Sequence, residues 1–206
     1  MPDVTVFGFS FDAYVRTACL ALEEKGVDYT TDVLALHLPE PQAHHPFSKS
    51  PAFRHGDVDL FETVAITTYV DEAFEGPALQ PRDPADKARM HQWISAFNDN
   101  GAPALLPIIV HRLVLCPPDE AIIAGNLAMA RKTLEVFDAA LADSEWLIGP
   151  SLTLADLFLA PPIVYLPMFP EGDELLAGLA NLDRWFATIA ARPSFAATEP
   201  DMPSLF

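Results

Sequence analysis

The sequence predicts a small α/β domain followed by a larger all-helical domain, and three observations carry that prediction. Strand and helix signals alternate from the N-terminus to about residue 76, whereas helical periodicity dominates after about residue 84. Half of the 206 residues are hydrophobic, which is enough to bury a sizeable core and excludes a disordered chain. We therefore expect an α/β domain over 1–76, a linker over 77–84 and a helical domain over 85–206.

The first domain has a distinctive order of elements. They are a strand at 4–8, a helix from 12 that Gly26 ends, a strand at 28–34, a loop or irregular short helix at 36–50, two strands at 52–55 and 58–61, and a helix from 62. Gly56-Asp57 is a hairpin signal between the last two strands. The order βαβ, loop, ββα is the thioredoxin-like arrangement.

Helices fill the second domain. Asp83 is placed to cap the first of them, with Pro84 at its first helical position. Apolar residues recur every three or four positions over 123–141, which is typical of an amphipathic helix, and a similar pattern over 182–189 ends near Arg192-Pro193. The domain is therefore predicted to be all-α.

The segment SLTLADL is a folding signal between two of these helices. Thr153 can cap the amide of Asp156, whose carboxylate can reach back to the cap, as in a capping box. Leu152 and Leu157 are placed to close a hydrophobic staple around that turn. The motif predicts a helix start and carries no catalytic information.

The charge of the chain argues against a nucleic-acid partner. The formal net charge is −17, and only 12 Lys and Arg residues are spread along the sequence. Binding to DNA or RNA requires clustered cations that displace counterions from phosphates. An anionic ligand must therefore be held by a few local cations against the overall field.

Targeting and metal signals are weak in this sequence. The N-terminus lacks the basic segment of a signal peptide, and prolines interrupt the most apolar stretch, 157–169, before it could span a bilayer. We expect a soluble, cytoplasmic protein with no membrane partner. Cys19 and Cys116 form no CxxC or metal-ligand pattern and lie among apolar residues, so we expect two buried free thiols and no metal.

Several segments together resemble the cytosolic glutathione transferases. They are VTVFGFSFDAYVRTACLALEEKGVDY, HPFSKSPAF with GDVDLFETVAITTYVDE, LTLADLFLAPPIVYL and RWFATIAARPSF. The segment HQWISAFNDNGAPALLPIIVHRL and the prolines after LADL are closest to phi-like bacterial members. The resemblance covers nearly the whole chain in order. It implies the two-domain transferase fold, glutathione as a co-substrate, and a homodimer, with Phe47 as either an interface anchor or a cover for the core.

The resemblance places a glutathione site in the first domain. Ser50-Pro51 matches the family's cis-proline, whose preceding backbone pairs with the cysteinyl unit of glutathione as an added strand; the alternative is an ordinary trans proline. Thr63 at a helix start would bind the γ-glutamyl carboxylate, and Glu62 would meet the ammonium group; the alternative is an ordinary acidic first turn.

Lys49 and His37 are the local cations expected to bind the glycine carboxylate of glutathione. Lys49 matches a contact position of the family. His37 matches one only if the irregular loop contains no gap, and a solvated loop histidine is the alternative.

The catalytic group departs from the family pattern. A serine at the start of the first helix normally donates a hydrogen bond to the glutathione thiolate, but that position falls on Asp12, and the tyrosine-type position falls on Gly8. An ionised Asp12 accepts hydrogen bonds but donates none. The simpler interpretation of Asp12 is that it is the N-cap of the helix. Ser10 and Tyr14 are the remaining candidate donors, with backbone amides as a further alternative.

A second-substrate pocket is expected close to the thiol. Phe9 and Phe11 are the candidates near the thiol for lining an apolar electrophile site. Trp93 and Phe97 are further candidates from a later helix, and the alternative is that they are core residues. Arg16 matches a common arginine of the family, with a structural role favoured over ligand contact.

Three functions remain open from the sequence. The leading hypothesis is conjugation of glutathione to apolar electrophiles. The alternatives are glutathione-dependent reduction of disulfides or peroxides, and a transferase fold retained for binding without catalysis, which Asp12 favours.

Overall fold

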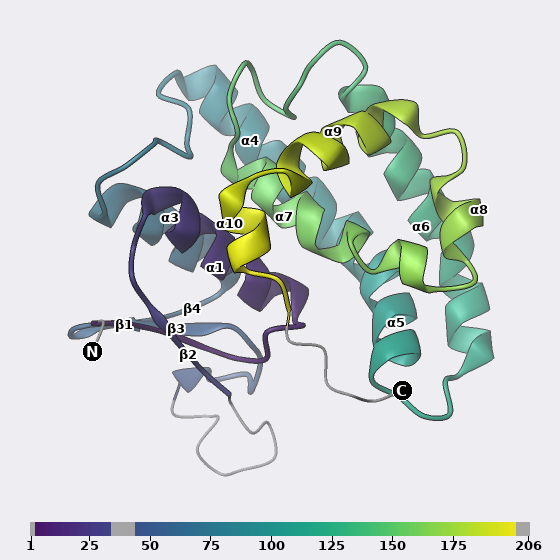
Figure 1. Cartoon of the computed structure of the whole chain (residues 1–206), viewed down its shortest axis with the longest axis horizontal. Helices are drawn as coiled ribbons and strands as arrows, with labels where there is room; N and C mark the ends of the chain where they lie inside the picture. The colour runs from purple at the N-terminus through teal and green to yellow at the C-terminus, as the bar shows by residue number, and fades with distance from the viewer. Residues whose placement is uncertain (1–2, 34–43, 201–206) are drawn as a thin grey trace. The chain divides into compact units, whose positions relative to one another are not determined.

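The computed structural model describes residues 3–33 and 44–200, whose contacts form two compact units (Figure 1). One unit holds the chain up to Gln80 together with the segment that begins at Arg192, and the other runs over Pro81–Ala191. The first unit contains β1 (Val4–Phe7), α1 (Ala13–Lys25), β2 (Thr30–Asp32), β3 (Ala52–His55), β4 (Val58–Phe61), α3 (Thr63–Ala73) and α10 (Pro193–Ala197). The second contains α4 (Pro84–Ala96), the π-helical turn η1 (Phe97–Gly101), α5 (Ala102–Leu113), α6 (Glu120–Ala140), α7 (Leu154–Ile163), the 3₁₀ turn η2 (Leu166–Met168), α8 (Gly172–Leu176) and α9 (Ala180–Ala190).

The first unit is built on a four-stranded mixed sheet with strand order β2-β1-β3-β4. β1 runs parallel to β2 and antiparallel to β3, with Val6 opposite Phe53, and β3 and β4 form an antiparallel hairpin. Helices α1 and α3 lie side by side on one face of this sheet (Figure 1). The hairpin strands have the predicted bounds, and the α/β and all-helical fold classes are confirmed.

Helix α1 begins and ends where its sequence predicts. The Asp12 carboxylate accepts hydrogen bonds from the amides of Tyr14 and Val15, at 2.8 and 3.3 Å, and so satisfies two donors that the helix leaves without a partner. Gly26 ends the helix with φ 67°, a left-handed conformation in which a side chain would be strained. These two residues fix the two ends of α1.

The predicted capping box organises the core of the helical unit. Asp156 is fully buried, and its carboxylate accepts hydrogen bonds from the amides of Leu147 and Thr153, each at 2.9 Å. It also accepts a 2.9 Å bond from the indole nitrogen of Trp185 on α9, whose side chain is itself fully buried. One carboxylate therefore joins the start of α7, the preceding loop and α9.

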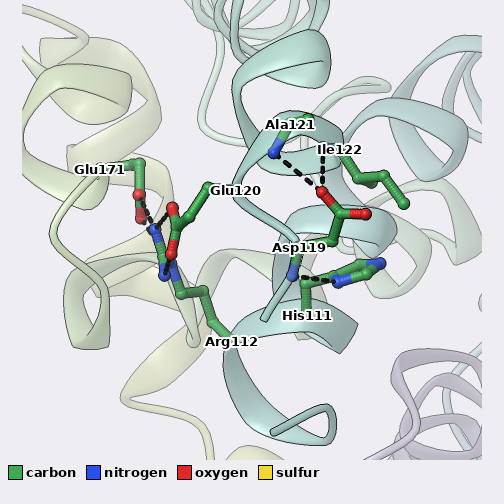
Figure 2. Close-up of polar contacts among 7 residues, drawn as sticks. All are labelled: His111, Arg112, Asp119, Glu120, Ala121, Ile122 and Glu171. Carbon is green, nitrogen blue, oxygen red and sulfur yellow. Dashed lines mark hydrogen bonds and ion pairs between the residues drawn. The ribbon is translucent and has the colours of Figure 1, made fainter. Parts of the chain in front are cut away.

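A second polar cluster joins the end of α5 to the start of α6 (Figure 2). The Arg112 guanidinium donates to both carboxylate oxygens of Glu120, at 2.8 and 2.9 Å, and also to the carboxylate of Glu171. The amide of Asp119, the N-cap of α6, donates to the Nδ1 atom of His111 at 3.0 Å. Bidentate pairs of this kind hold a helical corner in one geometry.

The two cysteines differ from the sequence expectation in one respect. Both are free, and Cys19 on α1 is buried, where burial raises the pKa of its thiol to about 12. Cys116 is exposed, so the prediction of a second buried thiol is wrong. The residue lies in the loop between α5 and α6, and its apolar neighbours Val114 and Leu115 are themselves 43 % and 44 % exposed. Among the described residues, the helices are too short or too polar to cross a bilayer.

Replacing Asp156 with alanine should destabilise the protein severely. The Asp156→Ala substitution leaves the Leu147 amide, the Thr153 amide and the Trp185 indole N–H buried without their acceptor, at a cost of about 3–5 kcal/mol in the free energy of unfolding. Urea unfolding measures the change. The matched control is Asp83→Ala, which removes an exposed N-cap and should cost about 1 kcal/mol. Similar losses in the two variants would contradict the role given to Asp156.

Candidate functional site

The loop that enters β3 carries the predicted cis-proline. The Ser50–Pro51 peptide bond is cis, Pro51 is buried, and β3 begins at the next residue, Ala52. Ser50 therefore lies just before β3, where an extended peptide can pair with the backbone as an added strand. The sequence predicted the cis bond correctly from the segment PFSKSPAF.

The side chain of Ser50 makes a contact that the sequence did not reveal. Its hydroxyl donates a 2.6 Å hydrogen bond to Oδ2 of Asp12, while Oδ1 of Asp12 accepts the two amides at the start of α1. Burial raises the pKa of the Asp12 carboxyl, although the hydrogen bonds from Ser50, Tyr14 and Val15 act in the opposite direction. A carboxyl group with this environment therefore lies between the first helix and the cis-proline loop.

The turn from β1 into α1 packs closely on the same loop. Gly8 has φ +147°, and a Cβ atom at this position would lie 2.4 Å from Cγ2 of Val15 and 3.0 Å from Cβ of Ser50. A side chain would therefore clash with both the helix and the loop. The position that the tyrosine-type mechanism requires can hold only glycine in this backbone.

The start of α3 has the features of an anion site. Glu62, its N-cap, has φ 69° and ψ 119°, a left-handed conformation that is strained for a residue with a side chain. Its exposed side chain makes no capping hydrogen bond to the helix, and Thr63, the first helical residue, is buried. Strained backbone of this kind is concentrated at ligand sites, and a helix start that its N-cap leaves uncapped favours an anion.

The local cations include one residue that the sequence analysis did not select. Lys49 is exposed beside the cis-proline, whereas His37 lies outside the described residues. His45, which the sequence analysis did not select, is buried, and its Nδ1 accepts the amide of Phe47 at 3.2 Å. Burial lowers the pKa of His45, with Glu62 opposing this shift and Lys49 adding to it, so these charges lie near the imidazole. The run HHPF directly before SKSP was the only sequence signal for it.

The two candidate hydroxyl donors occupy different environments. Ser10 is exposed in the turn before α1 and lines a cavity of about 520 Å³ together with Arg16, Tyr29 and Thr198. The described residues that line this cavity include none from the cis-proline loop or the start of α3. Tyr14 is half-buried, and its amide belongs to the helix cap. The assignment of either hydroxyl to the thiol stays a prediction.

Arg16 ties α1 to the C-terminal segment of its unit. Its guanidinium is buried, donates to the carbonyl of Phe195 at 3.0 Å and to the hydroxyl of Thr198 at 3.4 Å, and lies 4.0 Å from the centre of the Phe195 ring. These contacts are internal to the protein. They support the structural role that the sequence favoured over ligand contact.

The four aromatic candidates fall into two groups. Phe9 and Phe11 are half-buried and stack on each other, with ring centres 5.2 Å apart, in the turn before α1. In the helical unit, Trp93 packs on Phe137 with ring centres 5.1 Å apart, and Phe97 is only 1 % exposed. Phe97 is therefore a core residue in this structure, while the other three keep exposed surface. Within the part of the chain that the structure describes, no cluster of three or more His, Cys, Asp or Glu residues is arranged to hold a metal.

The fold and the cis-proline loop place this chain among proteins that join a thioredoxin-like domain to an all-helical domain. Residues 2–72 match the family model for the glutathione S-transferase N-terminal domain, and residues 97–193 match the model for the C-terminal domain of the same family. Glutathione S-transferase 4 of Zea mays is 32 % identical over 98 % of this chain and 94 % of its own length. The chain belongs to the glutathione S-transferase family.

Solved structures of this family are similar over nearly the whole chain. Glutathione S-transferase I from maize, in complex with an atrazine glutathione conjugate, has a TM-score of 0.83 at 27 % identity and covers 96 % of each chain. The theta-class enzyme of Xanthomonas axonopodis pv. citri, with glutathione bound, has a TM-score of 0.83 at 26 % identity, covering 96 % of this chain and 97 % of the other.

Proposed function

We propose that this protein is a glutathione transferase that joins the thiol of glutathione to apolar electrophiles. Its family membership and the glutathione conjugate in the maize relative support this function. Within the chain, one observation carries the proposal. The start of α3 has a strained backbone at Glu62, whose side chain makes no capping hydrogen bond to the helix, and this suits a ligand with a free carboxylate.

Glutathione would bind in an extended conformation beside β3. The backbone of Ser50 pairs with the cysteinyl unit, as an added strand would. The γ-glutamyl carboxylate accepts from the Thr63 amide and hydroxyl at the positive end of α3, and the Glu62 carboxylate meets the ligand's ammonium group. Lys49 and His37 bind the glycine carboxylate, and these few cations offset the unfavourable field of a chain with net charge −17.

The second substrate would be an apolar electrophile. Phe9 and Phe11 provide an apolar stacked pair in the turn directly before α1, next to the residues proposed to hold the cysteinyl unit. Trp93 and Phe97 are the candidates from the helical unit, with Phe97 acting through the packing of its neighbours because its ring is buried. Ser10 and Tyr14 are the candidate hydroxyl donors to the sulfur.

We further propose that the protein acts as a cytoplasmic homodimer without a metal. The Phe47 side chain is 68 % exposed and stands edge-on to the ring of Phe61, itself 39 % exposed, at 6.4 Å between ring centres. An exposed aromatic pair of this size is unfavourable in water and typical of a protein interface. The low content of clustered cations argues against nucleic acid as a partner.

Glutathione binding should depend on the Glu62 carboxylate. The Glu62→Ala substitution keeps a Cβ atom at φ 69°, so the backbone strain is unchanged and only the partner of the ligand's ammonium group is lost. We expect affinity for glutathione to fall at least about tenfold, which is about 1.4 kcal/mol. Isothermal titration calorimetry at neutral pH measures it, with Glu75→Ala, an exposed acidic residue of the same unit, as the control. Equal affinity in both variants would place the γ-glutamyl group elsewhere, and no binding to the wild-type protein at millimolar glutathione would contradict the proposed function.

The oligomeric state should depend on Phe47. The Phe47→Ser substitution removes the exposed ring, and we expect the dimer to dissociate into monomers in sedimentation velocity measurements. The matched control is Val33→Ser, because Val33 in the same unit is similarly exposed, at 62 %. A wild-type monomer, or a Phe47→Ser variant that stays dimeric, would contradict the proposed interface.

A further inference from the structure

We propose that Asp12, held in place by Ser50, is the group that takes the proton from the thiol of glutathione. The inference rests on the proposed function, because it requires the cysteinyl unit to lie against the backbone of Ser50. Helix capping alone would give Asp12 a structural role, and the inference adds a catalytic one.

Each oxygen of the Asp12 carboxylate has a distinct set of partners. Oδ1 accepts the amides of Tyr14 and Val15, which uses both of its lone pairs. Oδ2 accepts the Ser50 hydroxyl at 2.6 Å, which uses one lone pair and leaves one to receive a proton. Three hydrogen bonds therefore hold the carboxylate in one orientation, with the free acceptor site on the oxygen that faces the cis-proline loop.

The position of Ser50 connects this acceptor to the substrate. Ser50 precedes the cis-proline and would pair through its backbone with the cysteinyl unit, while its side chain bonds to Asp12. The thiol is the side chain of that cysteinyl unit, so it would lie beside Ser50. Asp12 is thus the ionisable side chain bonded directly to the proposed cysteinyl site.

The electrostatic environment of Asp12 suits a proton acceptor. Burial raises the pKa of its carboxyl, and the Ser50 hydroxyl and the two helix amides lower it. A higher pKa makes a carboxylate a stronger base, and catalysis improves as the pKa of the base approaches the working pH.

The chemical step balances without another reactant. An ionised carboxylate beside the sulfur disfavours a stored thiolate, so the thiol stays protonated until it attacks. As the sulfur forms its bond to the electrophilic carbon, the S–H bond breaks and the proton moves to Oδ2 of Asp12. In a substitution the leaving group departs with its bonding electron pair, and Asp12 later releases the proton to water. In an addition to an α,β-unsaturated ketone, Asp12 returns the proton to the α-carbon.

The Asp12→Asn substitution separates this role from helix capping. Asparagine caps a helix as well as aspartate does but cannot accept a proton in this way. We expect kcat for conjugation to an α,β-unsaturated ketone to fall about 100-fold, while the affinity for glutathione in calorimetry changes little. The remaining rate should rise with pH as the bound thiol ionises unaided. The control is Asp83→Asn, the same change at the N-cap of α4, which should leave kcat unchanged.

A second variant tests the part played by Ser50. The Ser50 hydroxyl lowers the pKa of Asp12, so Ser50→Ala should raise that pKa and move the acid limb of the kcat/KM profile to higher pH. A purely structural contact would lower the rate at every pH without moving the limb. An unmoved limb would therefore overturn the assignment.

The outcomes distinguish the inference from the proposed function. An active wild-type protein whose Asp12→Asn variant is equally active, or faster, would show that the carboxylate only opposes ionisation of the thiol, and would overturn the inference alone. A wild-type protein that binds glutathione but conjugates no electrophile would overturn the proposed function, and the inference with it.

Discussion

The hydrogen bond between the Ser50 hydroxyl and the Asp12 carboxylate is the contact on which the rest of the site depends. It joins residues 38 positions apart in the sequence and fixes the start of α1 against the loop that enters β3. The close packing of Gly8 on Ser50 leaves no room for a side chain between them. The start of α1 and the cis-proline loop are therefore packed against each other. A peptide that pairs with the loop would lie beside the carboxyl group of Asp12.

The start of α3 is the second part of the proposed site, and its backbone is strained. Glu62 keeps a left-handed backbone at the entrance to α3, although glycine would adopt that conformation at no steric cost. A carboxylate at this strained position is suited to a charged ligand group. His45 is buried among aromatic rings nearby, where the opposing effects of Glu62 and Lys49 on its pKa mark a local arrangement of charges. The strained backbone at Glu62 thus lies where the γ-glutamyl end of the ligand would bind.

Short-range signals explain most of what the sequence predicted correctly. The caps at Asp12 and Gly26 and the capping box at Asp156 each depend on residues within a few positions, and the structure has all of them. The contact between Ser50 and Asp12 could not be predicted, because it depends on how two distant segments meet. The exposure of Cys116 was missed for the same reason, since apolar neighbours in a sequence do not ensure burial in a loop.

The most direct test of this account is a crystal structure of the wild-type protein with reduced glutathione bound. We predict that the cysteinyl backbone pairs with Ser50 and that the sulfur lies within hydrogen-bonding distance of Oδ2 of Asp12, about 3.5 Å. A sulfur beyond hydrogen-bonding distance of the Asp12 carboxylate, with Ser50 between the two groups, would contradict the account and return Asp12 to a capping role alone.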